Sequence, residues 1–362
     1  MQVAGAEVLV RETIRSLGPA IQPTIFCLDS IGSMGEELIA AGVDVVSLDR
    51  RPGLDFRVSR RMAAAARDRQ IDVIHAHQYT PFFYAALAKP LLWPTMPKLI
   101  LTEHGRHFPS VVSPKRRAFN RLILDRCADA VNACCLFSAR DLSRVDGFSG
   151  ARIEIIENGI EVDRYGPTLD MPAHKLKMGL DPRRRYIAHV ARHHPEKDQT
   201  TLIRAYSAIS AEFPDVDLLL VGDGQLRHEL EGLTRTLNVV ERVHFVGIRK
   251  DVPDWLRAAD IYALTSIIEA ASLTLMEAMV TGLPSVVSNV GGNPELVRDN
   301  IEGLHFERGD AVGCAAAFRR LLADPTLSHR LGSAARSRAI ARYRLGDTVS
   351  AYYRLYCKLT GF

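Results

Sequence analysis

The chain has 362 residues, of which 47% are hydrophobic and 24% are charged, with a formal net charge of +4. This length allows two globular domains that each bury a core, and so small a net charge gives no indication of a nucleic-acid partner. No apolar run reaches the ~18 residues that a membrane-spanning helix needs, and no secretory signal opens the chain. No two of the six cysteines have the two-residue gap of a zinc or redox motif, so we expect no metal site and a cytoplasmic location.

The opening residues predict a loop of small side chains that leads directly into an amphipathic helix. They read MQVAGAEVLVRETIRSL, and no apolar strand stands ahead of the loop. In an α/β domain a strand normally feeds such a loop. Two explanations stay open: the true start lies upstream, or the protein does without its first strand. The absence of a central strand would expose backbone groups and apolar surface, so we expect poor solubility.

Short apolar runs alternate with helical patterns through the rest of the first half. The expected strands are 24–28, 44–48, 73–75, 99–102 and 130–133. Strands that alternate with helices indicate βαβ units, and therefore a parallel sheet with helices on both faces. We expect the apolar segment 81–93 to be a buried helix, because it is too short to cross a bilayer and contains Lys89.

Basic side chains crowd two segments of the first half, residues 50–69 and 115–126. Solvated helix faces and contact with anionic lipid headgroups both explain such a pattern. The sequence leaves the two explanations open, so peripheral contact with the inner face of a membrane is one expectation.

A second series of strands and helices begins after Asn158 and Gly159. Its expected strands are 186–190, 216–221, 243–246, 261–264 and 285–287, and its expected helices are 198–212, 225–237, 252–257 and 273–280. We therefore divide the chain into an α/β domain at 1–164, a second at 165–342, and a terminal helix at 343–362 that packs back toward the first. The parallel sheets of two such domains face each other across a cleft, where ligands of these folds bind.

A stretch late in the second half, TSIIEAASLTLMEAMVTGLPS, carries a strong chemical signal. It places Glu269 in a loop, Ser272 as the expected N-cap, and Glu277 inside an apolar helix. A helix N-terminus offers unpaired N–H groups and partial positive charge, so the backbone at Ser272, Leu273 and Thr274 suits a diphosphate. Spacing alone also allows surface or capping roles for the two glutamates, but the apolar neighbours of Glu277 make an unneeded charge costly there. The stretch predicts a nucleotide-sugar site.

The segment ARHHPEKD leaves an expected strand and enters a helix. Its cations Arg192 and Lys197 could hold a leaving diphosphate by bidentate and point-charge contacts respectively. The alternative is a solvated loop with a Lys–Glu pair. The three histidines of this region, in one irregular loop, lack the separated-ligand pattern of a zinc site, so we predict no metal.

Residues at other strand ends give weaker signals. Gly222, Val246 and Gly247 follow or end expected strands, where small residues let a ribose or base approach the backbone. In the first domain, Gly5 lies in the small-residue loop and suits a phosphate or sugar, and His104 follows a strand. Taken singly, such residues are more often structural. The loop GGNPE is as well explained by a plain connector as by a ligand role.

Together and in this order, the motifs resemble those of the retaining glycosyltransferases of family 4, which have the GT-B fold of two Rossmann-like domains. The resemblance rests on the pair Glu269 and Glu277 with AMVTGLPSVVSNVGGNPELV, on ARHHPEKD, LLLVGDG and HFVG, and on IENGI at the interdomain link. It implies that Arg192 and Lys197 bind the donor diphosphate and that Glu277 binds the ribose. It also implies that Glu269 contacts the transferred sugar and that His104 lies near the reacting anomeric carbon.

The chain departs from the family pattern at three points. EAAS, with Ala270 and Ser272, replaces a glycine-rich turn, so we expect a sugar pocket that is tighter or differently shaped. Ala4 and Gly5 stand where the family has paired glycines in the first loop. The third departure is the family's first strand, which is missing.

The resemblance implies transfer of a sugar from a nucleoside diphosphate sugar to a hydroxyl, with retention and without a metal or other cofactor, in cell-surface polysaccharide or glycolipid synthesis. The expected partners are the nucleotide-sugar donor and a glycan or lipid-linked acceptor. Two alternatives stay open: a nucleotide-sugar epimerase of similar fold, which needs no acceptor, and an inactive nucleotide-sugar-binding subunit. The base, the sugar and the acceptor are not determined by the sequence.

Overall fold

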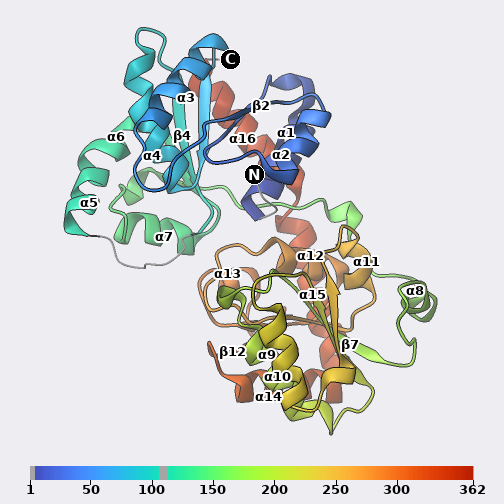
Figure 1. The fold of residues 1–362 in the computed structure, drawn as a ribbon. Helices are drawn as coiled ribbons and strands as arrows, with labels where there is room; N and C mark the ends of the chain where they lie inside the picture. The colour runs from blue at the N-terminus through green and yellow to red at the C-terminus, as the bar shows by residue number, and fades with distance from the viewer. Residues whose placement is uncertain (1–4, 106–112, 362) are drawn as a thin grey trace. The chain divides into compact units, whose positions relative to one another are not determined.

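The structure is a computed structural model, and it describes residues 5–105 and 113–361 (Figure 1). The chain divides into two compact units: unit 1 comprises Met1–Gly159 with Leu345–Phe362, and unit 2 comprises Ile160–Arg344. Residues 160–164 thus fall in unit 2, and the C-terminal segment of unit 1 begins at Leu345.

Unit 1 is an α/β unit in which every strand pair is parallel. Its helices and strands are α1 (Gly5–Leu17), β1 (Thr24–Cys27), α2 (Gly32–Ala40), β2 (Asp44–Ser47), α3 (Arg57–Asp68), β3 (Val73–His77), α4 (Tyr79–Ala88), β4 (Lys98–Glu103), α5 (Pro114–Phe119), α6 (Asp125–Cys127), β5 (Ala130–Ala133), α7 (Leu136–Arg144), β6 (Ile153–Ile155) and α16 (Leu345–Thr360). The expected strands of this half are all present, and β6 is a strand that the sequence did not indicate.

The strands of unit 1 form two separate sheets, β1-β2 and β3-β4-β5-β6. On one face of the larger sheet, Leu99 and Leu101 of β4 pack in a core with α3 and α4. On the other face, Ile100 packs with Tyr352 and Leu355 of α16. The helix at the end of the chain is thus part of the core of unit 1, where it also packs against α1.

The apolar segment that we expected to be a buried helix over residues 81–93 is helical up to Leu92: most of it lies in α4, and a 3-10 helix over Lys89–Leu92 follows directly. The α4 part is mostly buried, whereas Trp93, which follows the 3-10 helix and precedes Pro94, is 68% exposed. None of the described helices is long and apolar enough to cross a bilayer.

Unit 2 contains a second parallel α/β sheet. Its helices and strands are α8 (Met171–Lys177), β7 (Arg185–Val190), α9 (Gln199–Ser210), β8 (Val216–Val221), α10 (Arg227–Thr236), β9 (Val243–Gly247), α11 (Val252–Arg257), β10 (Ile261–Leu264), α12 (Leu273–Thr281), β11 (Ser285–Ser288), α13 (Asn293–Leu296), β12 (Gly303–Phe306), α14 (Ala311–Ala323) and α15 (Pro325–Arg342). The expected strands and helices are all present, and β12 is an additional strand.

The six strands of unit 2 have the order β12-β11-β10-β7-β8-β9. Every residue of β8 is buried, as expected for a strand with a hydrophobic core on each face. From β7 the chain adds β8 and β9 on one side, and it then returns to place β10 on the other side of β7. The strand order therefore reverses between β7 and β10. With unit 1, this sheet confirms an α/β fold of two parallel-sheet domains.

Candidate active site

The loop after β7 and the loop after β10 lie side by side, because these two strands are neighbours where the strand order reverses. The N–H of Ile267 donates to the carbonyl of Glu196 at 2.8 Å. The hydroxyl of Thr265 donates to the carbonyls of Lys197 and Asp198 at 2.9 and 3.0 Å. Ligands of open α/β sheets bind outside the carboxyl ends of the strands at such a reversal. The two joined loops therefore form the candidate ligand site of unit 2.

Two of the residues singled out from the sequence form an ion pair across these loops. The Nζ atom of Lys197 lies 2.6 Å from Oε2 of Glu269, and the hydroxyl of Ser266 donates to the same oxygen at 3.0 Å. The two side chains are only 21% and 14% exposed, so water screens the pair less than it would a surface pair. The partner of Lys197 is thus a residue 72 positions away in the sequence.

The first turn of α12 begins directly after the Glu269 loop. Ser272 is its N-cap, as expected: its hydroxyl accepts from the N–H of Leu275 at 3.3 Å. The hydroxyl of Thr274 lies 2.8 Å from that of Tyr262 on β10, which ties the turn to the sheet. The N–H groups of Leu273 and Thr274 belong to the first turn of a helix, where no intrahelical acceptor exists. These donors make the turn a candidate anion site.

Glu277 lies one turn further along α12 and is partly buried. Burial raises the pKa of this carboxyl to about 7, although a hydrogen bond with Tyr165 acts in the opposite direction. Tyr165 itself is buried, at 8% exposure. A carboxyl group kept inside an apolar helix at such a cost is typical of a functional site.

Glycines lie at the carboxyl ends of the neighbouring strands β8 and β9. The N–H of Gly222, after β8, donates to the carbonyl of Gly247 at the end of β9 at 2.8 Å, with the partly buried Val246 beside it. A Cβ atom on Gly222 would lie 2.1 Å from the carbonyl oxygen of Ala191, which immediately precedes Arg192. Arg192 is exposed, and its guanidinium has no hydrogen bond or ion pair with another described residue.

Gly291 supports the site and was not among the site residues chosen from the sequence. It adopts a φ of +55°, and a Cβ there would lie 1.8 Å from the carbonyl oxygen of Glu269. The N–H of the next residue, Gly292, donates to that same oxygen at 3.0 Å. The loop after β11 therefore holds the backbone of Glu269 in place. In the sequence, the paired glycines of GGNPE indicate a close approach to another segment of backbone. They do not indicate that this segment is the Glu269 loop.

In unit 1, His104 follows β4 and His77 ends β3, and these parallel neighbours bring the two rings together. Nδ1 of His77 lies 2.9 Å from Nε2 of His104. Burial lowers the pKa of His104 to about 4, an effect that Asn158 partly offsets, so the ring is neutral near pH 7. Nδ1 of His104 and Oδ1 of Asn158 are both buried, and the side chain of Asn158 is the group that interacts with the His104 ring.

Gly5, the remaining residue chosen from the sequence, is the first residue of α1 and is exposed. The structure thus places the chosen residues in two groups. Unit 1 holds Gly5 and His104, and unit 2 holds the others at the ends of β7 to β10. Asn158 of unit 1 lies in the IENGI motif, and the sequence analysis did not predict it as a site residue.

His189, the histidine on β7 near Arg192, has structural partners: Nδ1 lies 2.9 Å from the carbonyl oxygen of Ala263, and Nε2 lies 3.2 Å from the amide nitrogen of Gln199. Neither ring nitrogen of the buried His193 has a hydrogen-bond partner in the described part of the chain. Burial lowers the pKa of His189 to about 4. Across the described residues, no group of three or more His, Cys, Asp or Glu side chains is arranged to hold a metal ion.

Two family models together match nearly the whole chain. The model described as Glycosyltransferase Family 4 matches residues 3–164, and the model described as Glycosyl transferases group 1 matches residues 170–338. The first match lies in unit 1 apart from its last residues, and the second lies within unit 2.

Individual relatives agree with these matches. Over 318 residues the chain is 28% identical to N-acetyl-alpha-D-glucosaminyl L-malate synthase of Bacillus anthracis, covering 87% of this chain and 82% of that protein. It is 27% identical over 267 residues to UDP-Gal:alpha-D-GlcNAc-diphosphoundecaprenol alpha-1,3-galactosyltransferase of Escherichia coli, covering 71% and 68%. These comparisons favour neither the epimerase nor the inactive subunit.

The fold is also that of known glycosyltransferase structures. Anabaena Alr3699/HepE in complex with UDP superposes with a TM-score of 0.86 at 22% identity, covering 98% of this chain and 96% of that chain. Sucrose-phosphate synthase from Thermosynechococcus elongatus gives a TM-score of 0.80 at 21% identity, covering 99% and 94%. The chain therefore belongs to the glycosyltransferases of group 1 and family 4, and its two parallel-sheet units are those of the GT-B fold.

Proposed function

We propose that this glycosyltransferase moves a sugar from a nucleoside diphosphate sugar to a hydroxyl acceptor, with retention at the anomeric carbon and without a metal or other cofactor. The observation that carries the proposal is the Lys197–Glu269 pair at the reversal of strand order in unit 2, beside the first turn of α12. Three separate sources of positive charge then serve one diphosphate: Lys197, Arg192, which is unpaired among the described residues, and the helix N-terminus.

Each side chain has a distinct part in holding the donor. Arg192 binds diphosphate oxygens in a bidentate manner, Lys197 acts as a point charge, and the N–H groups of Leu273 and Thr274 donate to the phosphate nearest the sugar. The carboxylate of Glu277 accepts hydrogen bonds from the ribose hydroxyls. Glu269, held by Lys197 and by the loop of Gly291, accepts from hydroxyls of the transferred sugar.

The chemical step is a displacement on one face of the sugar. The bond between the anomeric carbon and the diphosphate oxygen breaks, and its electron pair stays with the diphosphate. The acceptor oxygen bonds to the anomeric carbon on the same face, and its proton passes to the departing phosphate oxygen. Fixed positive charge around that oxygen stabilises the negative charge that develops in the transition state. His104, as a neutral ring, contacts the sugar near the reacting carbon.

The relatives suggest which donor to test first. The Escherichia coli relative carries UDP-Gal in its name, and the Anabaena structure contains UDP. We therefore propose a uridine diphosphate sugar as the donor class, with the backbone near Val246 and Gly247 facing the base.

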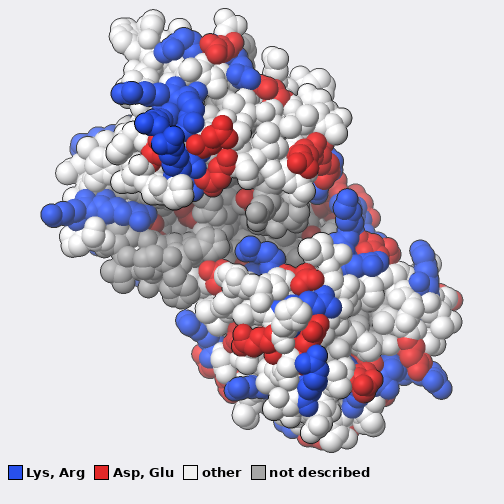
Figure 2. Space-filling view, viewed as in Figure 1, with Lys and Arg blue, Asp and Glu red and all other residues white. Residues whose placement is uncertain are grey.

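A basic surface supports a lipid-linked or cell-surface glycan acceptor. Figure 2 shows basic side chains gathered over the part of unit 1 that carries α3 in Figure 1, and α3 exposes Arg57 and Arg60. Leu54 and Phe56 lie just ahead of this helix and are 73% and 61% exposed. Exposed apolar side chains beside basic ones suit peripheral contact with an anionic membrane. Co-sedimentation with vesicles that contain anionic lipid, and no co-sedimentation with neutral vesicles, is the expected result.

The proposal is tested by a transfer assay on the full chain. The protein is incubated with UDP-sugars and with glycan and undecaprenyl-diphosphate-linked acceptors. Mass spectrometry then detects the enlarged acceptor, and proton NMR gives the configuration of the new bond. Transfer with the anomeric configuration of the donor supports the proposal. A product of inverted configuration, or transfer that stops when divalent metal is removed by chelation, contradicts it.

A further inference from the structure

Gln78, the first residue after β3, has a backbone conformation that is unusual for a residue with a side chain. Its φ is +81° and its ψ is 161°. The other described non-glycine residues with positive φ have values between +45° and +60°, close to the φ range of the left-handed helical region. The angles of Gln78 belong to a region that is essentially reserved for glycine, and strain of this kind clusters at functional sites.

Strand ends in unit 2 adopt positive φ with glycine. Gly247, at the end of β9, has a φ of +78°, and Gly222, after β8, has a φ of +133°. Glycine adopts such angles without steric strain, whereas a residue with a Cβ atom does so at a cost. A strained residue persists only where its surroundings fix it. The glutamine at this strand end therefore indicates a side-chain contact that offsets the strain.

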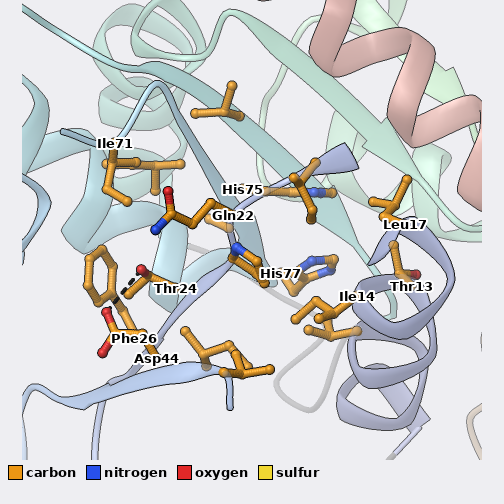
Figure 3. Close-up of a pocket in the computed structure, with 18 of the residues that line it drawn as sticks. Thr13, Ile14, Leu17, Gln22, Thr24, Phe26, Asp44, Ile71, His75 and His77 are labelled. Carbon is orange, nitrogen blue, oxygen red and sulfur yellow. Dashed lines mark hydrogen bonds between the residues drawn. The ribbon is translucent and has the colours of Figure 1, made fainter. Parts of the chain in front are cut away.

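The two edges of β3 have different surroundings. On one side, β1 and β3 line a cavity of about 1720 Å³ within unit 1, and His77 is among the residues that border it (Figure 3). On the other side, β3 pairs in parallel with β4. The N–H of Gln78 donates to the carbonyl of Thr102 at 2.8 Å, which continues the pairing past His77. Gln78 is therefore held from the side of β4, where Glu103 and His104 follow.

The side-chain amide of Gln78 contacts the residues on both sides of His104. In the orientation that its hydrogen bonding favours, the amide nitrogen donates to Oε1 of Glu103 at 2.7 Å and to the carbonyl of Gly105 at 3.0 Å. Glu103 is 5% exposed, and its Oε1 also accepts from the N–H of Gly105 at 3.1 Å. One amide thus links the two ends of the short turn that carries His104.

The residue before Gln78 contacts the ring itself. Nδ1 of His77 lies 2.9 Å from Nε2 of His104. Two successive residues at the end of β3 therefore hold both the ring and its backbone. A change of Gln78 to relaxed backbone angles would redirect its side chain away from the turn. The strained conformation is thus coupled to the position of His104.

We propose that Gln78 is a positioning residue for sugar transfer: its side-chain amide holds the turn around His104, so that the ring keeps one place and one tautomer. This role rests on the proposed function, in which His104 contacts the transferred sugar. Gln78 then acts on the chemical step through His104 and leaves the diphosphate site of unit 2 unaffected.

Gln78→Gly and Gln70→Gly separate loss of the side-chain contact from relief of backbone strain. Gln70, after α3, is an exposed glutamine with a φ of +51°, so glycine relieves strain at both positions. Both variants should melt within a few degrees of the wild type. Only Gln78→Gly should lower kcat, on the order of tenfold, with less than roughly a twofold change in the dissociation constant for UDP. Normal turnover in Gln78→Gly, or a loss that Gln70→Gly shares, overturns the proposal.

A double-mutant cycle tests whether Gln78 acts through His104. In the His104→Ala background the turn has no ring to position, so Gln78→Gly should lower kcat less than roughly twofold there. A loss as large as that in the wild-type background would show that Gln78 acts independently of His104, which contradicts the proposal.

A measurement without catalysis distinguishes failure of this role from failure of the proposed function. Proton–nitrogen correlation spectra of chains with isotope-labelled histidine report the tautomer of each ring, and His104→Ala identifies the His104 signals. Gln78→Gly should shift these signals or show both tautomers, whereas Gln70→Gly should leave them unchanged. Unchanged His104 signals in Gln78→Gly overturn the positioning role even where sugar transfer is observed. Shifted signals in a chain that transfers no sugar refute the proposed function alone.

Gln78→Asn replaces Gln78→Gly in these measurements if the glycine variant does not fold. Asparagine accepts positive φ more readily than most residues and keeps an amide, but its side chain is shorter by one methylene group. It should therefore lose contact with the turn, with the same fall in kcat and the same change in the His104 signals. Wild-type turnover and wild-type His104 signals in Gln78→Asn would show that the amide does not position the ring.

Discussion

Lys197 and Glu269 form a partly buried ion pair with 2.6 Å between Nζ and Oε2, although they lie on loops that follow different strands. The pair exists because β7 and β10 are adjacent at the reversal of strand order. It holds the lysine ammonium against the loop that leads into α12. In the proposed mechanism a diphosphate therefore meets a cation already in place, which lowers the entropic cost of binding.

Arg192→Ala should reduce kcat/KM for the donor roughly tenfold to a hundredfold, because one charged, bidentate contact to the diphosphate is lost. Its exposed side chain has no partner within the described residues, so the melting temperature should stay unchanged. Arg235→Ala is the matched control, because Arg235 is also exposed and lies near the end of α10. An equal loss of activity in both variants would show that the effect is not specific to the site.

A comparison of Gly291→Ala with Gly309→Ala should separate the loss of stability caused by backbone strain from the loss of activity caused by displacement of Glu269. Both glycines have positive φ, +55° and +74°, so backbone strain alone should cost each alanine variant on the order of 1 kcal/mol of stability. Only at Gly291 does the new methyl group collide with Glu269, whereas a Cβ on Gly309 meets nothing within 4 Å. We expect kcat/KM to fall at least roughly tenfold in Gly291→Ala alone. Full activity in that variant would remove Gly291 from the site.

The pH dependence of stability should report the buried carboxyl of Glu277. Its pKa is raised from 4.5 to about 7, so the native state keeps this proton to higher pH than the unfolded chain does. The stability that this group contributes is therefore complete below pH 4.5 and is lost as the pH rises to about 7. Over that window the loss is about 3 kcal/mol.

Glu277→Gln removes this titration, so its free energy of unfolding should fall less than that of the wild type across the same window. Urea unfolding at a series of pH values measures the difference, with Glu241→Gln as an exposed control. Parallel profiles for the wild type and Glu277→Gln would show that the carboxyl is not held protonated.

His104→Ala should separate chemistry from nucleotide binding. We expect turnover to fall on the order of tenfold or more, because in the proposed mechanism the ring contacts the transferred sugar and not the diphosphate. The dissociation constant for UDP should change less than twofold. A His104→Ala variant that binds UDP weakly but turns over normally at saturating donor would reverse this assignment.

The strand pattern of both units could be predicted because apolar runs alternate with helical periods. The two strands that were not predicted are β6 and β12. The first has only three residues, Ile153–Ile155, with Glu154 between its two isoleucines, and the second contains His305 among four residues. Such short runs become strands because a neighbouring parallel strand supplies backbone partners, which local sequence does not show.

The candidate site was predictable to the extent that its residues lie in motifs. Glu269, Ser272 and Glu277 are close in sequence around one helix start, so their proximity follows from local structure. The contact of Lys197 with Glu269 and that of Gly291 with the Glu269 backbone depend on strand order, which the sequence does not reveal. Likewise, the cavity that β1 and β3 of unit 1 line is visible only in three dimensions.

Titration calorimetry of the full chain with UDP tests the central claim most directly, because it requires neither the correct sugar nor the acceptor. The wild type and Arg235→Ala should bind UDP equally, and Lys197→Ala should bind at least roughly tenfold more weakly, since it loses a cation and leaves Glu269 unpaired beside the diphosphate. UDP binding by Lys197→Ala that is as tight as that of the wild type would contradict the proposed site.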